Sequence, residues 1–175
     1  MEEKFIKELL KWNQTHKLTN YSSYEEIKKQ IEDSLYPLKI ESTLKDAKSA
    51  IDIGTGAGFP GLILAMNMPN TTWYLVEPIK KRYSFLNYIK TLLNLKNVKI
   101  IPTRLENSNL QKVDLITSRA VMRVKDILKI AKPFMHENST LLLYKGSNIF
   151  DELKEANVNA KIISKDKRNY IFIKE

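Results

Sequence analysis

Cysteine is absent from this chain of 175 residues, and histidine occurs only twice, as His16 and His136. Without cysteine the chain can form no disulfide, no thiolate-bound zinc site and no thiol nucleophile. The two histidines lie far apart in the sequence, and neither has the spacing of a metal ligand. We therefore expect no catalytic metal.

Long apolar runs are also missing, since no stretch approaches the ~18 residues of a membrane-spanning helix. Charges interrupt the apolar pairs of residues 1–8, which is unlike a signal peptide. Apolar residues nevertheless make up 43% of the chain, which is enough for a full core, so we do not expect disorder. We expect a cytoplasmic monomer with no membrane partner, built as one domain with an appendage.

Glycine is scarce but concentrated, because four of the five glycines fall within residues 54–61. A short apolar run, residues 50–53, precedes them, and a helix-like run, residues 62–66, follows. Glycine has no Cβ and tolerates positive φ, so a strand, a glycine turn and a helix let backbone come close to a ligand. The helix then presents unpaired N–H groups to an anionic or polar group. The pattern predicts a nucleotide-like cofactor at residues 54–61.

Strand-like and helix-like segments alternate from Lys48 onward. The strand-like runs are 50–53, 72–76, 98–101, 113–117, 140–144, 160–163 and 170–174, and the helix-like runs are 60–68, 79–93, 123–132 and 149–156. This alternation predicts an α/β fold with a mostly parallel seven-stranded sheet covered on both faces. The short polar link at 164–169 favours an antiparallel last strand, because a parallel crossover needs a dozen or more residues.

The N-terminal part has a different pattern. Residues 3–13 and 24–36 carry apolar side chains with helical period, and Ser23 and Glu26 are spaced as a capping box. We therefore expect a helical extension over residues 1–48, followed by the cofactor-binding domain over residues 49–175. The extension either forms one wall of a substrate cleft or simply packs against the domain.

The glycine turn admits two cofactor classes, besides an ordinary tight turn with no ligand. Residues 56–61 match the dinucleotide pattern G-x-G-x-x-G, and Glu77 lies where a ribose-binding acid belongs. S-adenosylmethionine (SAM) is favoured by Asp52, since an acid at the end of the first strand suits an ammonium group and would repel a pyrophosphate. The sheet also leaves little room for a dehydrogenase's substrate domain. In either case, the Glu77 carboxylate can accept both hydrogens of a ribose diol.

Several motifs together resemble the RsmG family, also called GidB, over about residues 12–146. The most specific is the Asp-x-Gly-x-Gly-x-Gly turn with its Gly-Phe-Pro-Gly ending, at 52–61. In the family's order there follow Leu-Val-Glu (75–77), Lys-Arg-Tyr-Ser-Phe-Leu (81–86), Arg-Leu-Glu (104–106), Thr-Ser-Arg-Ala-Val (117–121) and Tyr-Lys-Gly (144–146). Upstream, Lys-Leu-Thr (17–19) and Glu-Asp-Ser-Leu (32–35) are similar to family segments. They depart from the pattern at Lys17, which replaces an asparagine, and at Gln30, where a histidine is frequent.

The resemblance implies a Rossmann-like class I SAM-dependent methyltransferase that modifies N7 of a guanine in small-subunit (16S) ribosomal RNA. Guanine N7 carries a lone pair and no proton, so we expect catalysis by placement, with no general base and no catalytic side chain. The resemblance implies SAM contacts at Gly54, Phe59, Leu105, Glu106 and Arg119. To these we add the two acids Asp52 and Glu77 and the turn glycines Gly56 and Gly58. The expected cofactor site therefore consists of Asp52, Gly54, Gly56, Gly58, Phe59, Glu77, Leu105, Glu106 and Arg119.

The net charge of +9 lies entirely in residues 49–175, which hold 20 basic and 11 acidic residues, whereas residues 1–48 hold nine of each. A basic field around a cofactor site suits RNA, although a lysine-rich proteome would also raise the charge. The candidate RNA contacts are Lys80, Lys81, Arg82, Arg119, Arg123, Lys125 and Lys145. Each of these side chains can instead belong to a solvated helix face. A SAM enzyme for a protein or small molecule, and a non-catalytic RNA-associated module, stay open as alternatives.

Overall fold

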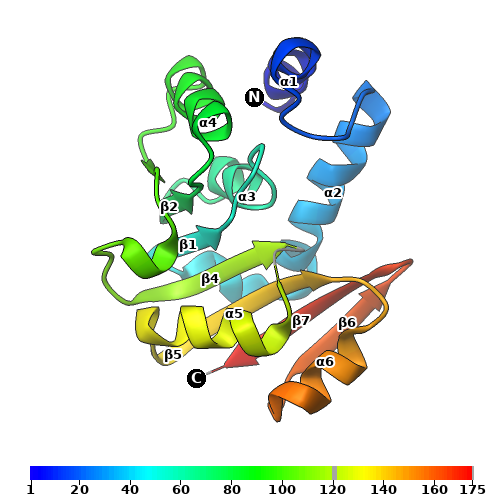
Figure 1. Ribbon diagram of the computed structural model, residues 1–175, viewed down its shortest axis with the longest axis vertical. Coiled ribbons are helices and arrows are strands. Elements are labelled where there is room, and N and C mark those ends of the chain that lie inside the picture. Colours follow the sequence, from blue (N-terminus) through cyan, green and yellow to red (C-terminus); the bar gives the residue numbers. More distant parts are fainter. Residues whose placement is uncertain (120–121, 175) are drawn as a thin grey trace.

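A twisted seven-stranded sheet forms the centre of the computed structural model, which describes residues 1–119 and 122–174, and helices cover both of its faces (Figure 1). The strands are β1 (Ser49–Ile53), β2 (Thr72–Val76), β3 (Val98–Ile101), β4 (Val113–Arg119), β5 (Met135–Lys145), β6 (Lys161–Lys165) and β7 (Arg168–Lys174). The α-helices are α1 (Glu2–His16), α2 (Tyr24–Ile40), α3 (Gly61–Asn67), α4 (Lys80–Leu92), α5 (Val124–Ala131) and α6 (Ile149–Ala156). Three short 3₁₀ helices are η1 (Ser42–Asp46), η2 (Leu105–Asn107) and η3 (Lys132–Phe134).

The strand order is β3-β2-β1-β4-β5-β7-β6. Neighbours from β3 to β5 are parallel, and β7 runs antiparallel to both β5 and β6. The predicted α/β fold with an antiparallel last strand is therefore confirmed. The chain moves outward from β1 to β2 and β3 and then returns to the other side of β1 as β4. This reversal creates a switch point at the C-terminal ends of β1 and β4, which is where such sheets bind ligands.

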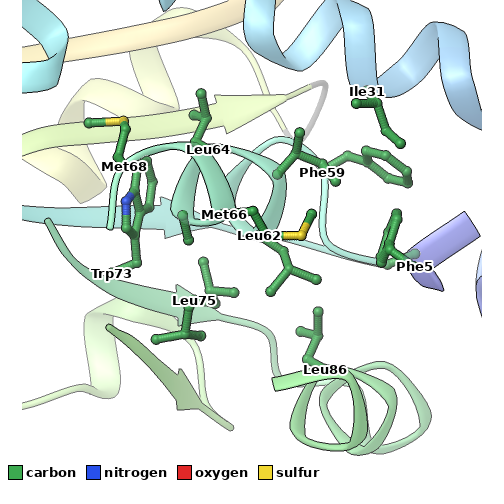
Figure 2. Close-up of a cluster of buried hydrophobic side chains, with 14 of the residues drawn as sticks. Phe5, Ile31, Phe59, Leu62, Leu64, Met66, Met68, Trp73, Leu75 and Leu86 are labelled. Carbon is green, nitrogen blue, oxygen red and sulfur yellow. The ribbon is translucent and has the colours of Figure 1, made fainter. Parts of the chain in front are cut away.

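Each face of the sheet buries its own apolar layer, because successive side chains of a strand point to opposite faces. In β1, Ala50 belongs to the layer under α1 to α4, whereas Ile51 belongs to the layer under α5 and α6. Figure 2 shows the first layer, where Leu62 and Trp73 lie between the sheet and the helices, and both are fully buried. Parallel strands covered on both faces explain the nearly continuous apolar runs in the sequence.

The N-terminal helices belong to the first of these layers. Ser23 and Glu26 form the expected capping box at the start of α2. The ring of Phe5 in α1 meets Phe59 edge to face at 5.5 Å between centroids, and the hydroxyl of Tyr144 donates to the Ser34 carbonyl at 2.7 Å. The extension thus shares one buried cluster with α3 and α4. None of the described helices is both long and apolar enough to cross a bilayer.

Candidate active site

A cleft of about 640 Å³ opens at the switch point, on the side toward which the arrowheads of β1 and β4 point (Figure 1). Its volume lies in the range of small-molecule and cofactor sites. The residues that line it come from the glycine turn, from the ends of β2 and β4, from η2 and from the α1–α2 loop. They include Lys17, Tyr21, Gly54, Thr55, Gly56, Phe59, Glu77, Ile79, Arg104, Leu105, Glu106, Arg119 and Met122.

The glycine turn is fixed to the end of β2. The N–H groups of Gly54 and Thr55 both donate to the Val76 carbonyl, at 3.0 and 3.1 Å. Gly54 and Gly56 have φ of 67° and 61°, which side chains with a Cβ rarely adopt. The turn therefore presents bare backbone to the cleft. Gly58 is not among the lining residues, because it faces the core, where an added Cβ would lie 3.0 Å from Leu62.

Glu77 joins the turn to the start of α4. One of its carboxylate oxygens accepts from Gly56 N–H at 3.0 Å, and the other accepts from Ile79 N–H at 2.8 Å. The residue is 2% exposed and the Arg82 guanidinium lies 3.8 Å away. Each carboxylate oxygen has a further lone pair. Glu77 can therefore hold the turn in shape and still accept hydroxyl hydrogens from a ligand in the cleft.

Asp52 lies elsewhere than we expected. Its side chain is fully buried beneath the turn and does not line the cleft. The Thr117 hydroxyl and the Gly61 N–H donate to its two oxygens, at 2.6 and 2.9 Å. Burial raises the pKa of Asp52 to about 6, against hydrogen bonds that lower it. The carboxyl group joins the N-terminus of α3 to the sheet. Because Asp52 does not reach the cleft, an ammonium group of a ligand there would not contact it.

Arg119 closes the other side of the cleft, at the end of β4. Its side chain is only 11% exposed, and its guanidinium carbon lies 5.0 Å from the centroid of the Phe59 ring. Its Nη1 donates to Gln30 Oε1 at 3.0 Å and lies 3.4 Å from an Asp33 carboxylate oxygen. Phe59 is itself held edge to face by Phe5 and Tyr21. An aromatic ring and a guanidinium thus border the cleft together.

Leu105 and Glu106, at which the family resemblance implied SAM contacts, lie in η2, just after β3. Leu105 is buried and Glu106 is exposed, and both line the cleft. Of the nine expected cofactor residues, the structure brings seven to the cleft and leaves Asp52 and Gly58 behind it.

The candidate RNA contacts divide into free and engaged side chains. Lys145 is 8% exposed. Its ammonium group donates to the Met122 carbonyl and to Glu152, which also accepts from Val124 N–H at 2.9 Å. Lys145 therefore holds Met122 and, through Glu152, the start of α5, and an RNA phosphate would have to compete with a partly buried ion pair. Tyr144, the residue before Lys145 in β5, is fully buried and so offers no surface on which an RNA base could stack.

The other candidates reach the surface to different extents. Arg123 is 70% exposed and pairs with Glu155 at 3.0 Å. Lys81 donates to the Lys17 carbonyl at 3.1 Å, and Arg82 lies near Glu77. Lys80 and Lys125 are exposed. Ala120 and Val121 of the Thr-Ser-Arg-Ala-Val motif lie outside the described residues.

Sequence reasoning missed Asp33 and Gln30 as neighbours of the cleft. They lie one turn apart in α2 and meet Arg119 across 86 and 89 residues of sequence. The sequence signal for them was the spacing of Gln30 and Asp33, which lie three positions apart on either side of the apolar Ile31. The same helix also buries Ile27 and Ser34.

A comparison with protein families matches residues 2–175 to the GidB family, described as rRNA small subunit methyltransferase G. The chain belongs to the GidB family. It is 46% identical over 172 residues to the Ribosomal RNA small subunit methyltransferase G of Campylobacter hominis, covering 98% of this chain and 90% of that protein. The protein of the same name from Helicobacter pylori is 45% identical over 146 residues, which is 83% of this chain and 80% of the relative.

Solved structures share the fold at low sequence identity. A precorrin-6y C5,15-methyltransferase from Geobacter metallireducens has a TM-score of 0.63 at 14% identity, with 92% of this chain and 91% of that chain covered. A mutant of MtNAS in complex with S-adenosylmethionine has a TM-score of 0.69 at 12% identity, with 99% and 71% covered. The predicted class I fold, the resemblance to the GidB family, the methyltransferase class and the SAM cofactor are thus confirmed.

Proposed function

We propose that this GidB-family chain transfers the methyl group of SAM to N7 of a guanine in the 16S RNA of the small ribosomal subunit, in the cytoplasm and as a monomer. The observation that carries the proposal is the composition of the cleft. Bare glycine backbone, the Glu77 carboxylate, the Phe59 ring and the Arg119 guanidinium meet at the switch point of a class I fold.

The cleft residues fit the parts of SAM. The backbone of Gly54 and Gly56 would lie along the amino-acid portion, and Glu77 would accept the ribose hydroxyls. Leu105 and Glu106 would border the adenine, and Ile79, which is 44% exposed at the rim, offers it an apolar surface. Arg119 would pair with the SAM carboxylate or with an RNA phosphate.

SAM, when bound, supplies a methyl group on a positively charged sulfur. The chain's own contribution is to hold the acceptor in line and to keep water out. Guanine N7 offers a lone pair, so no side chain has to remove a proton. The C–S bond breaks as the N7–C bond forms, and positive charge moves from sulfur to the purine. Phe59 and Arg119 border the place where an unstacked base would enter.

Exposed cations at the same edge support an RNA substrate. The exposed members of the candidate set are Lys80, Lys81, Arg123 and Lys125, and each can neutralise a phosphate. Lys145 is better explained as a structural ion pair.

The test is methyl transfer from isotope-labelled SAM to 30S particles, naked 16S RNA and total cell protein in parallel. Label in RNA that maps to N7 of a guanine supports the proposal. Label only in protein or in small molecules would show a different acceptor. Tight SAM binding with no transfer to any acceptor would identify a non-catalytic binding module.

A further inference from the structure

Asp33 connects three elements, α2, β4 and β7, at the edge of the cleft. Its carboxylate belongs to α2 and is 15% exposed. One oxygen accepts from Arg168 Nε at 3.1 Å and from the Tyr170 hydroxyl at 2.9 Å, both in β7. The other oxygen lies 3.4 Å from Arg119 Nη1. A carboxylate with this many donors is held in one place.

Arg119 needs such a partner because of where its charge lies. The guanidinium is largely removed from water and faces a cleft that receives a sulfonium. Two positive charges in a partly dry site repel each other far more than in bulk water. Gln30 gives Arg119 a hydrogen bond but no negative charge. Within residues 1–119 and 122–174, Asp33 is the carboxylate at salt-bridge distance from Arg119.

We propose that Asp33 is a positioning residue that holds Arg119 against Phe59 and offsets part of its positive charge, so that the cleft accepts the positively charged sulfur of SAM. The offset is partial because Arg119 shares the Asp33 carboxylate with Arg168. The inference rests on the proposed function, because it takes SAM as the ligand of this cleft. It gives the segment Glu-Asp-Ser-Leu (32–35), which is similar to a family segment, a role in the binding of SAM with its positively charged sulfur.

S-adenosylhomocysteine (SAH) makes the proposal testable without measuring turnover. It has the same adenosine and amino-acid parts as SAM, but it lacks the methyl group and the positive charge on sulfur. A change that merely distorts the cleft should weaken both ligands alike. Loss of a neutralising carboxylate should weaken SAM more than SAH. A change between variants in the ratio of the two dissociation constants, Kd for SAM over Kd for SAH, therefore reports how the site treats the methylated, positively charged sulfur, apart from effects common to both ligands.

The experiment is calorimetric titration of the full chain with SAM and with SAH, in the wild type, in Asp33→Asn and in Glu32→Gln. Asparagine keeps the shape of the side chain and removes its charge. Glu32 is the exposed neighbour on the same helix, so its variant controls for loss of one carboxylate. We expect Asp33→Asn to raise the ratio by about threefold or more, as for one partly screened unit charge, and Glu32→Gln to leave it unchanged. An unchanged ratio in Asp33→Asn would overturn the proposal.

A second variant keeps the proposal testable if Asp33→Asn does not fold. Arg119→Gln removes the cation instead, so it should lower the ratio even if both ligands bind more weakly. The double variant Asp33→Asn/Arg119→Gln should return the ratio toward the wild-type value. If Arg119→Gln leaves the ratio unchanged, the charge argument is wrong. Failure of the wild type to bind either ligand would instead contradict the proposed function itself.

Discussion

Replacing Gly61 with alanine should destabilise the fold by about 2–4 kcal/mol, because the new methyl group has no space. A Cβ at this position would lie 2.4 Å from Asp52 Cβ and 2.5 Å from one of its carboxylate oxygens. Asp52 is fully buried and held by Thr117, so it cannot swing aside. Overpacking of this kind costs about 1–3 kcal/mol, and weakening the bond from Gly61 N–H to Asp52 adds about 1 kcal/mol.

The assay is urea unfolding, with the midpoint and slope compared between variants. For a chain of this size, the expected loss corresponds to a fall in melting temperature of about 4–16 °C. Gly146→Ala is the matched control, because an added Cβ there meets no atom within 4 Å. It should stay within about 0.5 kcal/mol of the wild type. If Gly61→Ala unfolds at the same urea concentration as Gly146→Ala, the packing argument is refuted.

Four further changes probe the site and its supports. Gly54→Val should abolish SAM binding in calorimetry while far-UV circular dichroism still shows a folded core, because a branched side chain fills the cofactor's space; retained affinity would contradict the placement. Glu77→Ala should weaken SAM binding by about 1–3 kcal/mol through lost charged hydrogen bonds, and an unchanged dissociation constant would reject the ribose contact. Burial raises the pKa of Asp52 from 3.8 to about 6, so as pH rises Asp52 loses its proton in the unfolded chain before it does so in the folded protein. The free energy of unfolding of the wild type should therefore fall by up to about 3 kcal/mol as pH rises from about 4 to 6. The difference in unfolding free energy between wild type and Asp52→Asn should follow that slope, and a difference independent of pH would argue against the shift. Lys145→Met should lower stability in urea unfolding by about 1–3 kcal/mol, because it leaves the partly buried Glu152 without its cation, whereas loss of RNA affinity at full stability would show that Lys145 contacts RNA.

Most of the fold could be predicted because its signals are local. The alternation of strands and helices, the glycine turn and the capping box at Ser23 each depend on residues a few positions apart. The boundaries that differ have tertiary causes. Strand β5 begins at Met135, five residues before the expected start, because Met135 pairs with Val113 and the Ser139 hydroxyl bonds to the Val113 carbonyl.

The site could be predicted only in part, since side-chain partners far apart in sequence are invisible to a motif. The turn and Glu77 follow from spacing, and both lie at the cleft. The burial of Asp52 depends on Thr117, 65 residues away. The pairing of Lys145 depends on the position of α6 against the end of β5, and the contacts of Asp33 depend on β7, more than 130 residues on. From charge and sequence position alone, Asp52 and Lys145 were predicted to contact a ligand, and Asp33 was not predicted to have any role at the site.

A crystal structure of the chain with SAM bound tests the proposed function most directly. We predict SAM in the cleft with its ribose on Glu77, its amino-acid part along Gly54 and its methyl group facing the open mouth between Phe59 and Arg119. An empty cleft at saturating SAM, or a bound molecule whose methyl group faces a closed interior, would contradict transfer to an RNA base.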